Sequence, residues 1–367
     1  MADGGWLTLG VEEEYQIVDA EGRLRAHIDT LMEAATPKLG ELVKPEFIQS
    51  EVEVGTEICA DVAEARSEVV RLRQTLAELL DDAGLRLASA GTNPISHWHD
   101  QKITEGERYK LLEEEMQDIA RELLIFGLHV HVGIPDPDLR VEIVNEARYF
   151  LPHLLALSTS SPFWLGRNTG LKSYRTTVWS RFPRTGIPIE FPSWDEWENY
   201  VELLIKTNSI DNGKKIWWDL RAHYLYPTIE FRICDAATRV DETICIVALI
   251  QAVVAKLLKL RRQNLGFRKY PPALIAENKW RAARHGVGGQ LIDWGKHSEV
   301  PMAELAEEWL EFVDDVVDEL GSREDVEYIR TIVHDGTSAD RQLAAYAETG
   351  DLSAVVDRVC QETVAGL

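Results

Sequence analysis

The chain has 367 residues, in which 62 Asp and Glu residues outnumber 39 Lys and Arg residues, so its formal net charge at pH 7 is −23. Sequence-independent binding to nucleic acid or to an anionic membrane needs a large cationic surface, and this charge argues against both partners. The hydrophobic content of 45% is ordinary for a folded globular chain, and the length allows one large domain or two smaller ones.

The predicted elements begin with a strand over residues 7–18, where apolar and polar residues alternate. Helical periodicity follows in the segments 24–40, 62–85, 106–124, 139–158, 195–207 and 240–263. Strand-like runs lie near 47–58, 86–90, 126–134, 174–182 and 222–234. The segments 182–192 and 267–272 are rich in Pro and Gly, which predicts loops there. The last part of the chain is mostly helical, over 302–320, 324–333, 339–348 and 353–365.

This order of elements favours an α+β fold with an antiparallel sheet. Strands and helices do not alternate regularly, and the Gly-rich strand-to-helix turn of a doubly wound fold does not occur. Because no linker-like segment divides the chain, residues 1–367 are expected to form a single catalytic domain. Its α+β core is expected over about 6–300, with a helical C-terminal portion over about 301–367.

A reducing cytoplasm is the expected compartment. The N-terminus lacks the basic and apolar segments of a signal peptide. The longest apolar run, 244–260, is interrupted by Gln251, Lys256 and Lys259, so no membrane-spanning segment is expected. The cysteines show neither metal-binding nor disulfide-rich spacing, and they are expected to be small buried hydrophobic residues. They are Cys59, Cys234, Cys245 and Cys360.

Four of the predicted strands share one pattern, in which an apolar face alternates with a polar face. The polar faces carry Glu12 with Glu14, Glu51 with Glu53, His129 with His131, and Glu230 with Arg232. Each face could simply meet water, as is common in antiparallel sheets, but a solvated face usually mixes Lys, Thr, Ser and Arg. Gly127 and Gly133 flank the histidines and are poor strand formers, which indicates that something approaches the backbone closely there.

If these four polar faces line one concave sheet, they gather up to five carboxylates and two imidazoles. So many carboxylates cannot all stay ionised close together without cations. Oxygen-rich sites of this kind suit Mg²⁺, and the histidines add some preference for Mn²⁺. The four strands therefore predict a site for a divalent metal.

Arginines accompany the acidic set. Arg175 and Arg181 share a face if 174–182 is extended, and Arg281 and Arg284 lie three apart in the helical segment 277–286. Guanidinium groups bind phosphate or carboxylate well, although in an acidic protein they could equally form surface ion pairs. Metal carboxylates beside arginines are typical of ATP-dependent phosphoryl transfer. Because P-loop, GxGxxG, GxSxG and HExxH motifs are absent from the sequence, a nucleotide would bind on the sheet through metals.

Several motifs taken together identify a family. They are Gly10–Tyr15 (GVEEEY), Gly127–Gly133 (GLHVHVG), Leu155–Ser158, Ser161–Trp164, Ser173–Arg175, Glu230–Arg232, Glu277–Asn278 and Trp280–Ala282. From about residue 6 to residue 345 the chain resembles the carboxylate–amine ligases of the glutamate–cysteine ligase type 2 family. The resemblance implies a fold like the catalytic domain of glutamine synthetase, in which a curved antiparallel sheet forms a funnel with helices packed outside.

The resemblance also implies a reaction. ATP, with Mg²⁺ or Mn²⁺, would phosphorylate the γ-carboxylate of glutamate, and an amine such as cysteine would attack the resulting acyl phosphate to give an amide. Members of the family are commonly dimeric, so a homodimer is expected. Asn93 is a departure, because many members have His at this position of the segment 91–94. If Asn93 contacts substrate, the amine or the acid would differ, and the amine acceptor stays open.

Carried over motif by motif, the resemblance implies metal ligands at Glu12, Glu14, Glu53, His129 and Glu230. Glu53 and Arg232 are the expected catalytic residues, and Arg232 would contact the transferring phosphoryl group. The cations expected to bind nucleotide or substrate are Arg175, Arg181, Arg281 and Arg284. Glu51 and His131 share the same strand faces but receive no role from the resemblance.

Two other functions stay open at this point. A metal-dependent hydrolase would use His129 and His131 as amidohydrolase-like barrels do, but it would need the HxH motif near the start of a parallel barrel. A non-catalytic protein of the same fold would bind glutamate or nucleotide without turnover. Such a protein would have no need of a complete set of metal carboxylates.

Overall fold

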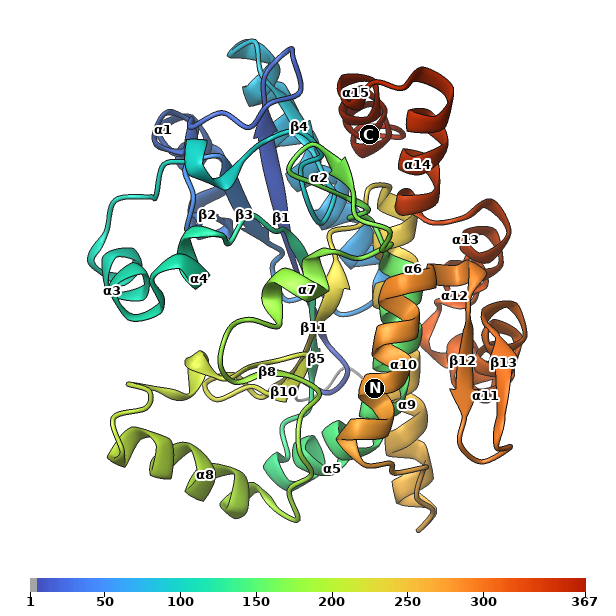
Figure 1. Ribbon diagram of the computed structural model, residues 1–367. Helices are drawn as coiled ribbons and strands as arrows, with labels where there is room; N and C mark the ends of the chain where they lie inside the picture. Colours follow the sequence, from blue (N-terminus) through green and yellow to red (C-terminus); the bar gives the residue numbers. More distant parts are fainter. Residues whose placement is uncertain (1–4) are drawn as a thin grey trace.

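A computed structural model of the chain describes residues 5–367 (Figure 1). Residues 1–4, part of the N-terminus in which no signal peptide is expected, lie outside this range. Seven strands form the main sheet in the order β10-β11-β5-β1-β3-β2, and β4 pairs with β1 beyond the end of β5. The strands are β1 (Leu9–Val18), β2 (Val43–Pro45), β3 (Glu51–Gly55), β4 (Arg86–Ala88), β5 (Gly127–Gly133), β10 (Leu220–Ala222) and β11 (Thr228–Asp235).

Every pairing within this sheet is antiparallel, which confirms the predicted α+β class and excludes the parallel barrel that the hydrolase alternative requires. Three small two-stranded sheets lie outside it. They are β6 (Phe163–Trp164) with β7 (Arg167–Asn168), β8 (Thr185–Gly186) with β9 (Trp217–Trp218), and β12 (Gln290–Asp293) with β13 (Ser298–Pro301).

Helices surround the sheet, and α11 to α15, coloured orange to red, lie along one side of the molecule (Figure 1). The helices of the first 300 residues are α1 (Ile28–Leu39), α2 (Val62–Asp82), α3 (Glu107–Met116), α4 (Asp118–Arg121), α5 (Pro137–Ala147), α6 (Leu151–Ser158), α7 (Arg175–Trp179), α8 (Trp194–Lys206), α9 (Val240–Arg262) and α10 (Pro272–His285). The remaining helices are α11 (Met302–Leu320), α12 (Arg323–Glu327), α13 (Ile329–Asp335), α14 (Ser338–Thr349) and α15 (Leu352–Thr363).

The apolar face of the sheet packs against α2, α6 and α9. Leu9, Val11 and Tyr15 of β1 are each at most 1% exposed. Helix α9 is long and apolar enough to cross a bilayer, but 83% of its apolar stretch is buried within the protein, as expected of a central core helix. Its polar residues do not interrupt it, because Gln251 donates to the carbonyl of Leu7 and the Lys256 ammonium reaches Asp315.

Glu13 is the only charged residue on the apolar face of β1, and α2 supplies its partner. Glu13 and Arg73 are 3% and 0% exposed, and the Arg73 guanidinium donates to both carboxylate oxygens. Arg73 Nη1 also donates to the carbonyl of Thr238 at 2.7 Å, and the Thr243 hydroxyl donates to Glu13 at 2.8 Å. A buried ion pair is tolerated only when its remaining polar atoms are hydrogen-bonded in this way. The network ties β1 and α2 to the start of α9.

The strand predicted at 174–182 is wrong, because this segment forms α7 and a turn. Its β-branched residues suggested a strand, but its buried positions follow helical spacing, with Arg175, Val178 and Phe182 separated by three and four residues. Two other strands are shorter than predicted. β3 ends at Gly55, which leaves Ile58 81% exposed, and the run at 222–234 is mostly β11, preceded by a turn that joins it to β10.

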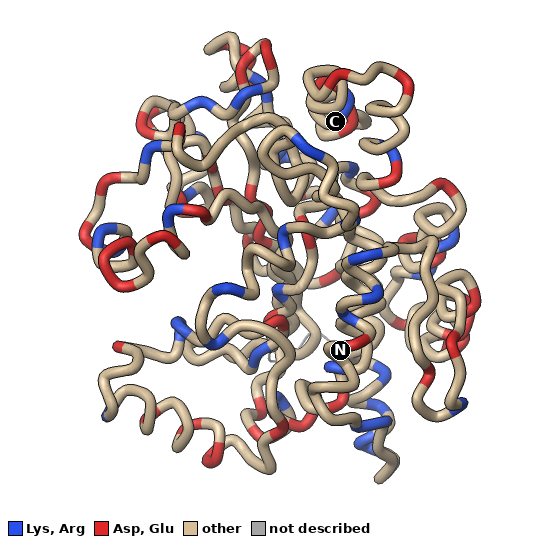
Figure 2. The backbone as a smooth tube through the Cα atoms, viewed as in Figure 1, with Lys and Arg blue, Asp and Glu red and all other residues tan. Residues whose placement is uncertain are grey.

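Acidic residues are spread over the outer helices (Figure 2). Helix α11 carries the densest group, and most of its members are exposed: Glu307, Glu308, Glu311, Asp314, Asp315, Asp318 and Glu319. The net charge of −23 is therefore mainly a property of the surface.

Replacing Arg73 with Met should lower the free energy of unfolding by about 3–5 kcal/mol, because it leaves the Glu13 carboxylate buried without its partner. The measurement is urea-induced unfolding followed by circular dichroism. Arg71→Met is the matched control on the same helix, since it removes only a partly exposed ion pair with Glu68 and should cost under about 1 kcal/mol. Equal losses in the two variants would contradict this account of the core.

Candidate functional site

The register of the sheet brings the polar faces of four strands together. The facing pairs are Glu12 with His129, Glu14 with Glu53, and His131 with Glu230. Facing residues of antiparallel strands have Cβ atoms about 5 Å apart, so these side chains are held near one another by backbone hydrogen bonds. The alternation seen in the sequence therefore becomes one continuous polar surface.

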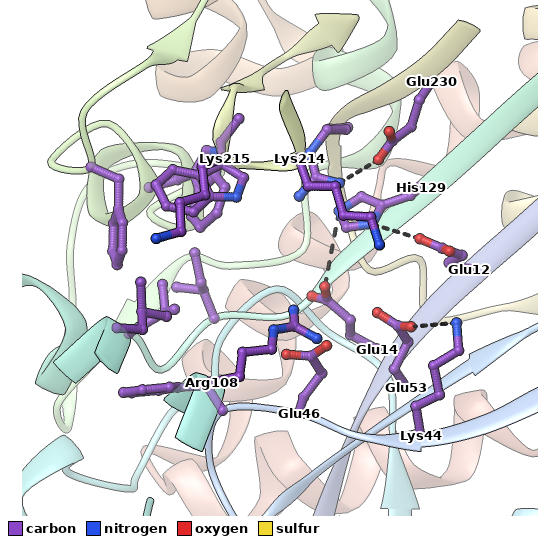
Figure 3. Close-up of a pocket in the computed structure, with 18 of the residues that line it drawn as sticks. Glu12, Glu14, Lys44, Glu46, Glu53, Arg108, His129, Lys214, Lys215 and Glu230 are labelled. Atoms are coloured by element: carbon purple, nitrogen blue, oxygen red, sulfur yellow. Dashed lines mark hydrogen bonds and ion pairs between the residues drawn. The ribbon is translucent and has the colours of Figure 1, made fainter. Parts of the chain in front are cut away.

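This surface opens into a cleft with a volume of about 720 Å³. Side chains of α3, α7 and the segment 211–217 form its other walls. The carboxylates that line it include Glu12, Glu14, Glu46, Glu51, Glu53 and Glu230, and the histidines are His129, His131 and His223. The cations that line it are Lys44, Arg108, Arg175, Lys214, Lys215, Arg221 and Arg232. Figure 3 shows Glu12 and Glu14 directed at His129, and Glu53 directed at Lys44.

Three of these residues could hold a divalent cation. One ligand atom from each of Glu12, His131 and Glu230 lies within 4.8 Å of the other two. His129 sits beside this triad, with Nδ1 at 3.4 Å from Glu12 and Nε2 at 3.9 Å from Glu14. Two carboxylates and one imidazole are a donor set that suits Mg²⁺ or Mn²⁺. The geometry thus favours His131 as a ligand at least as much as the expected His129.

The carboxylates of this triad are held ionised by neighbouring cationic and imidazole groups. Burial opposes the ionisation of Glu12, but the imidazoles of His129 and His131 keep its pKa well below the usual value. Burial acts on Glu230 in the same way, yet Arg221 and Arg232 hold the pKa of Glu230 well below normal. Both carboxylates are therefore ready to act as anionic ligands at neutral pH.

The neighbouring carboxylates show the opposite behaviour. Burial and the charge of Glu14 raise the pKa of Glu51 well above normal, and burial and the charge of Glu12 do the same to Glu53. Burial, together with Glu14, raises the pKa of Glu46 to about 7. This part of the cleft has more carboxylates than the protein's own cations can balance. The chemistry of the donor set therefore fits added divalent cations here as well.

Arg232 and Arg221 flank Glu230 from β11 and β10. The Arg221 Nε donates to Glu230 at 2.6 Å, and Arg232 forms an ion pair with the other carboxylate oxygen. Arg232 lines the cleft, and its guanidinium carbon lies 6.0 Å from the ring centre of Trp179 on α7. Of the other cations, Lys44 pairs with Glu53 at 3.4 Å. Among residues 5–367, Lys214 has no carboxylate within ion-pairing distance.

Glycine permits the close approach that the sequence indicates around the histidines. A Cβ added to Gly127 would lie 2.4 Å from the Arg175 guanidinium, and one added to Gly133 would lie 2.1 Å from the carbonyl of Gly5. The approaching groups thus belong to the protein itself. Arg175 lines the cleft and is 4% exposed, and its guanidinium lies 3.4 Å from the carbonyls of Arg232 and Ile233.

The other expected arginines do not reach the cleft. Arg181 follows α7 on its outer side and pairs with Glu122, so it does not share a face with Arg175. Arg281 lies on α10 and pairs with Glu277 and Glu299. Arg284, on the same helix, is exposed, and neither α10 arginine lines the cleft. Arg181 and Arg281 therefore form surface ion pairs, which is the alternative role considered for them from the sequence.

Asn93 does not line the cleft. Its amide donates to Gln16 and to the carbonyl of Gly22, and its Oδ1 accepts from the backbone of Ile95 and Ser96. The side chain is fully buried and holds a loop in place. The departure at Asn93 therefore gives no direct information about the substrate.

Sequence reasoning missed several residues that line the cleft: Lys44, Glu46, Arg108, Lys214, Arg221 and His223. Arg221 could have been found, since it lies opposite Glu230 in the β10–β11 hairpin. Lys44 lies in the three-residue strand β2, which is too short to show a period, and the others lie in loops or near the ends of elements.

Comparisons with known proteins agree with this geometry. The family model described as glutamate-cysteine ligase family 2 (GCS2) matches residues 8–362. A protein of Roseiflexus castenholzii is 58% identical over 98% of this chain and 96% of its own length, and one of Herpetosiphon aurantiacus is 56% identical over 98% and 94%. Both carry the name "Putative glutamate--cysteine ligase 2".

Solved structures show the same fold at low sequence identity. A glutamate–cysteine ligase of Francisella tularensis in complex with AMP matches with a TM-score of 0.72 at 14% identity, covering 98% of this chain and 89% of that one. A bifunctional glutathione synthetase of Pasteurella multocida matches with a TM-score of 0.70 at 15% identity, covering 98% and 52%. These matches confirm the fold class predicted from the sequence.

If the triad binds a divalent cation, millimolar Mn²⁺ should raise the melting temperature of the metal-free protein by roughly 3 °C or more, since binding at a hundred times Kd stabilises by about 2.7 kcal/mol. Differential scanning fluorimetry measures this shift. Glu12→Gln should reduce it, whereas Glu57→Gln, an exposed carboxylate just beyond β3, should not. Equal shifts in the Glu12 and Glu57 variants would remove Glu12 from the metal site.

Proposed function

The chain belongs to glutamate–cysteine ligase family 2, and from that premise we propose that it joins the γ-carboxylate of glutamate to an amine through an acyl phosphate made from ATP. The observation that carries the proposal is the polar surface of the sheet. Carboxylates and imidazoles from four strands lie there beside Arg232, in one cleft. Carboxylates for metal and an arginine for phosphate are the parts that phosphoryl transfer requires.

The reaction has two steps. In the first, a γ-carboxylate oxygen of glutamate attacks the terminal phosphorus of ATP, and the bond to the bridging oxygen of ADP breaks. In the second, the nitrogen of the amine attacks the γ-carbonyl carbon, the carbon–oxygen bond to the phosphoryl group breaks, and phosphate leaves with the bonding electrons. The amine nitrogen loses a proton as the amide forms.

Cationic side chains of the cleft, together with bound metal, would meet the electrostatic demand of this reaction. Glutamate and ATP are anions, and a protein of net charge −23 repels them unless the cleft is locally positive. Arg232 would donate to the transferring phosphoryl group, where negative charge develops. Lys214, which has no carboxylate partner within residues 5–367, would receive another phosphate or the substrate carboxylate.

Mg²⁺ or Mn²⁺ held by Glu12, His131 and Glu230, with His129 and Glu14 adjacent, would supply positive charge opposite the phosphates. Glu230 also holds Arg232 through their ion pair, so the same carboxylate would orient both a metal and the catalytic arginine. Glu53 is proposed as a ligand on the β3 side of the cleft, with Glu51 as its neighbour.

The free, buried cysteines fit a reducing compartment, and we propose the cytoplasm as the site of the reaction. A homodimer stays a prediction from family resemblance. A non-catalytic binding protein of the same fold is the second candidate. Only a measurement of turnover distinguishes it from the ligase.

The direct test is phosphate release from ATP in the presence of Mg²⁺, glutamate and a panel of amines, including hydroxylamine. The ligase predicts glutamate-dependent release and the formation of γ-glutamyl hydroxamate. Arg232→Met should reduce kcat by about 10³-fold, the magnitude seen when an arginine that contacts a transferring phosphoryl group is removed. Arg262→Met, at the exposed end of α9, is the matched control and should keep the wild-type rate. Nucleotide binding with no turnover for any amine would favour the non-catalytic protein.

A further inference from the structure

The wall of the cleft nearest Arg232 is apolar and aromatic. Trp179, Phe182 and Trp217 form one cluster, with ring centroids separated by 5.3, 6.2 and 5.8 Å. Aliphatic side chains extend this wall: Leu112, Leu123 and Ile125. Phe182 is buried and both tryptophans are half-buried, so the cluster has room to contact a ligand. Phosphates, metals and glutamate would make no use of such a surface.

Two further charges line the cleft on the aliphatic side of this wall, since Arg108 lies one helical turn from Leu112 on α3. Arg108, at the start of α3, lies beside Glu46, which follows β2 (Figure 3). The two groups make no direct ion pair with each other, and within the described residues neither has an ion-pair partner elsewhere. A carboxylate and a guanidinium side by side complement the ammonium and carboxylate of an α-amino acid, because each charge of the ligand meets an opposite charge.

We infer that this end of the cleft binds the amine acceptor, and that the acceptor is an α-amino acid with a bulky apolar side chain. Glu46 receives its ammonium, Arg108 receives its carboxylate, and the aromatic cluster receives its side chain. The inference rests on the proposed ligase function and names the second substrate of the same cleft.

The position of the aromatic cluster favours the acceptor over the base of ATP. The Trp179 ring centre lies 6.0 Å from the guanidinium carbon of Arg232, the residue proposed to contact the transferring phosphoryl group. The acceptor nitrogen must reach the carbon that carries this phosphoryl group, so the acceptor's side chain lies close to it. The adenine base is separated from the same phosphorus by a ribose and two further phosphates.

The size of the wall argues against cysteine as the preferred acceptor. A cysteine side chain has one methylene and a thiol, which would leave most of the three rings and three aliphatic side chains without contact. In an apolar pocket, a single missing methylene changes selectivity by about tenfold or more. Leucine or phenylalanine would fill this wall, and glycine would not contact it.

The first test compares acceptors for the wild-type enzyme. With ATP, Mg²⁺ and glutamate, kcat/KM for leucine or phenylalanine should exceed that for glycine or cysteine by about tenfold or more. Equal use of glycine or cysteine overturns the inference. Hydroxylamine separates this failure from failure of the ligase proposal, because it captures the acyl phosphate without a carboxylate or side chain. If no hydroxamate forms and no acceptor is used, both the ligase function and the acceptor assignment are wrong. If hydroxamate forms but apolar amino acids are not preferred, only the acceptor assignment is wrong.

The second test addresses the aromatic cluster. Trp217→Ala should reduce the ratio of kcat/KM for phenylalanine to that for glycine by about tenfold. Trp280→Ala is the matched control, since Trp280 is 54% exposed on α10 and lies outside the cleft, and it should preserve the ratio. A Trp217 variant that keeps the ratio and instead raises KM for ATP would assign the wall to the adenine base and overturn the inference.

The third test addresses Arg108 by comparing phenylalanine with 2-phenylethylamine, which lacks only the carboxylate. The wild type should prefer phenylalanine by about tenfold or more, and Arg108→Gln should lose this preference because the ion pair to the carboxylate is lost. Lys110→Gln removes the same charge from an exposed position of α3 outside the cleft and should keep the preference. Retained preference in the Arg108 variant would contradict the assignment.

Discussion

Repulsion among the carboxylates of one cleft is the constraint on which the rest of this structure depends. Backbone pairing holds Glu12, Glu14 and Glu53 on adjacent strands, where they cannot move apart without breaking the sheet. Histidines and arginines relieve the repulsion at Glu12 and Glu230, and burial with like charge raises the pKa of Glu51 and Glu53 instead. Divalent cations bound beside these carboxylates would relieve the remaining repulsion, which is the role proposed for the metal that accompanies ATP.

The opposite face of the same sheet explains how this arrangement is tolerated. β1 turns its apolar side chains and Glu13 toward α2 and α9, where Arg73 completes a buried hydrogen-bonded network. The strands are thereby fixed from behind, so that the polar face keeps its geometry against electrostatic repulsion. The net charge of −23 resides mostly on outer helices such as α11. It therefore does not determine the balance of charges inside the cleft.

Much of this organisation could be predicted from the sequence, because it depends on alternation along single strands. Period-two patterns placed Glu12, Glu14, His129 and Glu230 on faces that the sheet does bring together. The predicted position of Arg181 beside Arg175 is wrong. The β-branched residues around Thr176 resemble a strand, but the segment forms helix α7. Glu46, Arg108 and Lys214 could not be predicted, since their positions depend on how loops and α3 fold over the sheet. Local sequence patterns thus predict the residues on the strands of the sheet. The residues proposed to bind the amine acceptor can be identified only from the tertiary structure.

The measurement that tests the central claim most directly is isotope transfer from glutamate to phosphate. The enzyme would be supplied with ATP, Mg²⁺, an accepted amine and glutamate labelled with ¹⁸O in both oxygens of the γ-carboxylate. Activation of the carboxylate by phosphorylation predicts that each released phosphate carries one ¹⁸O atom, detected by mass spectrometry, while the other stays in the amide. Phosphate released without ¹⁸O during amide formation would contradict the account.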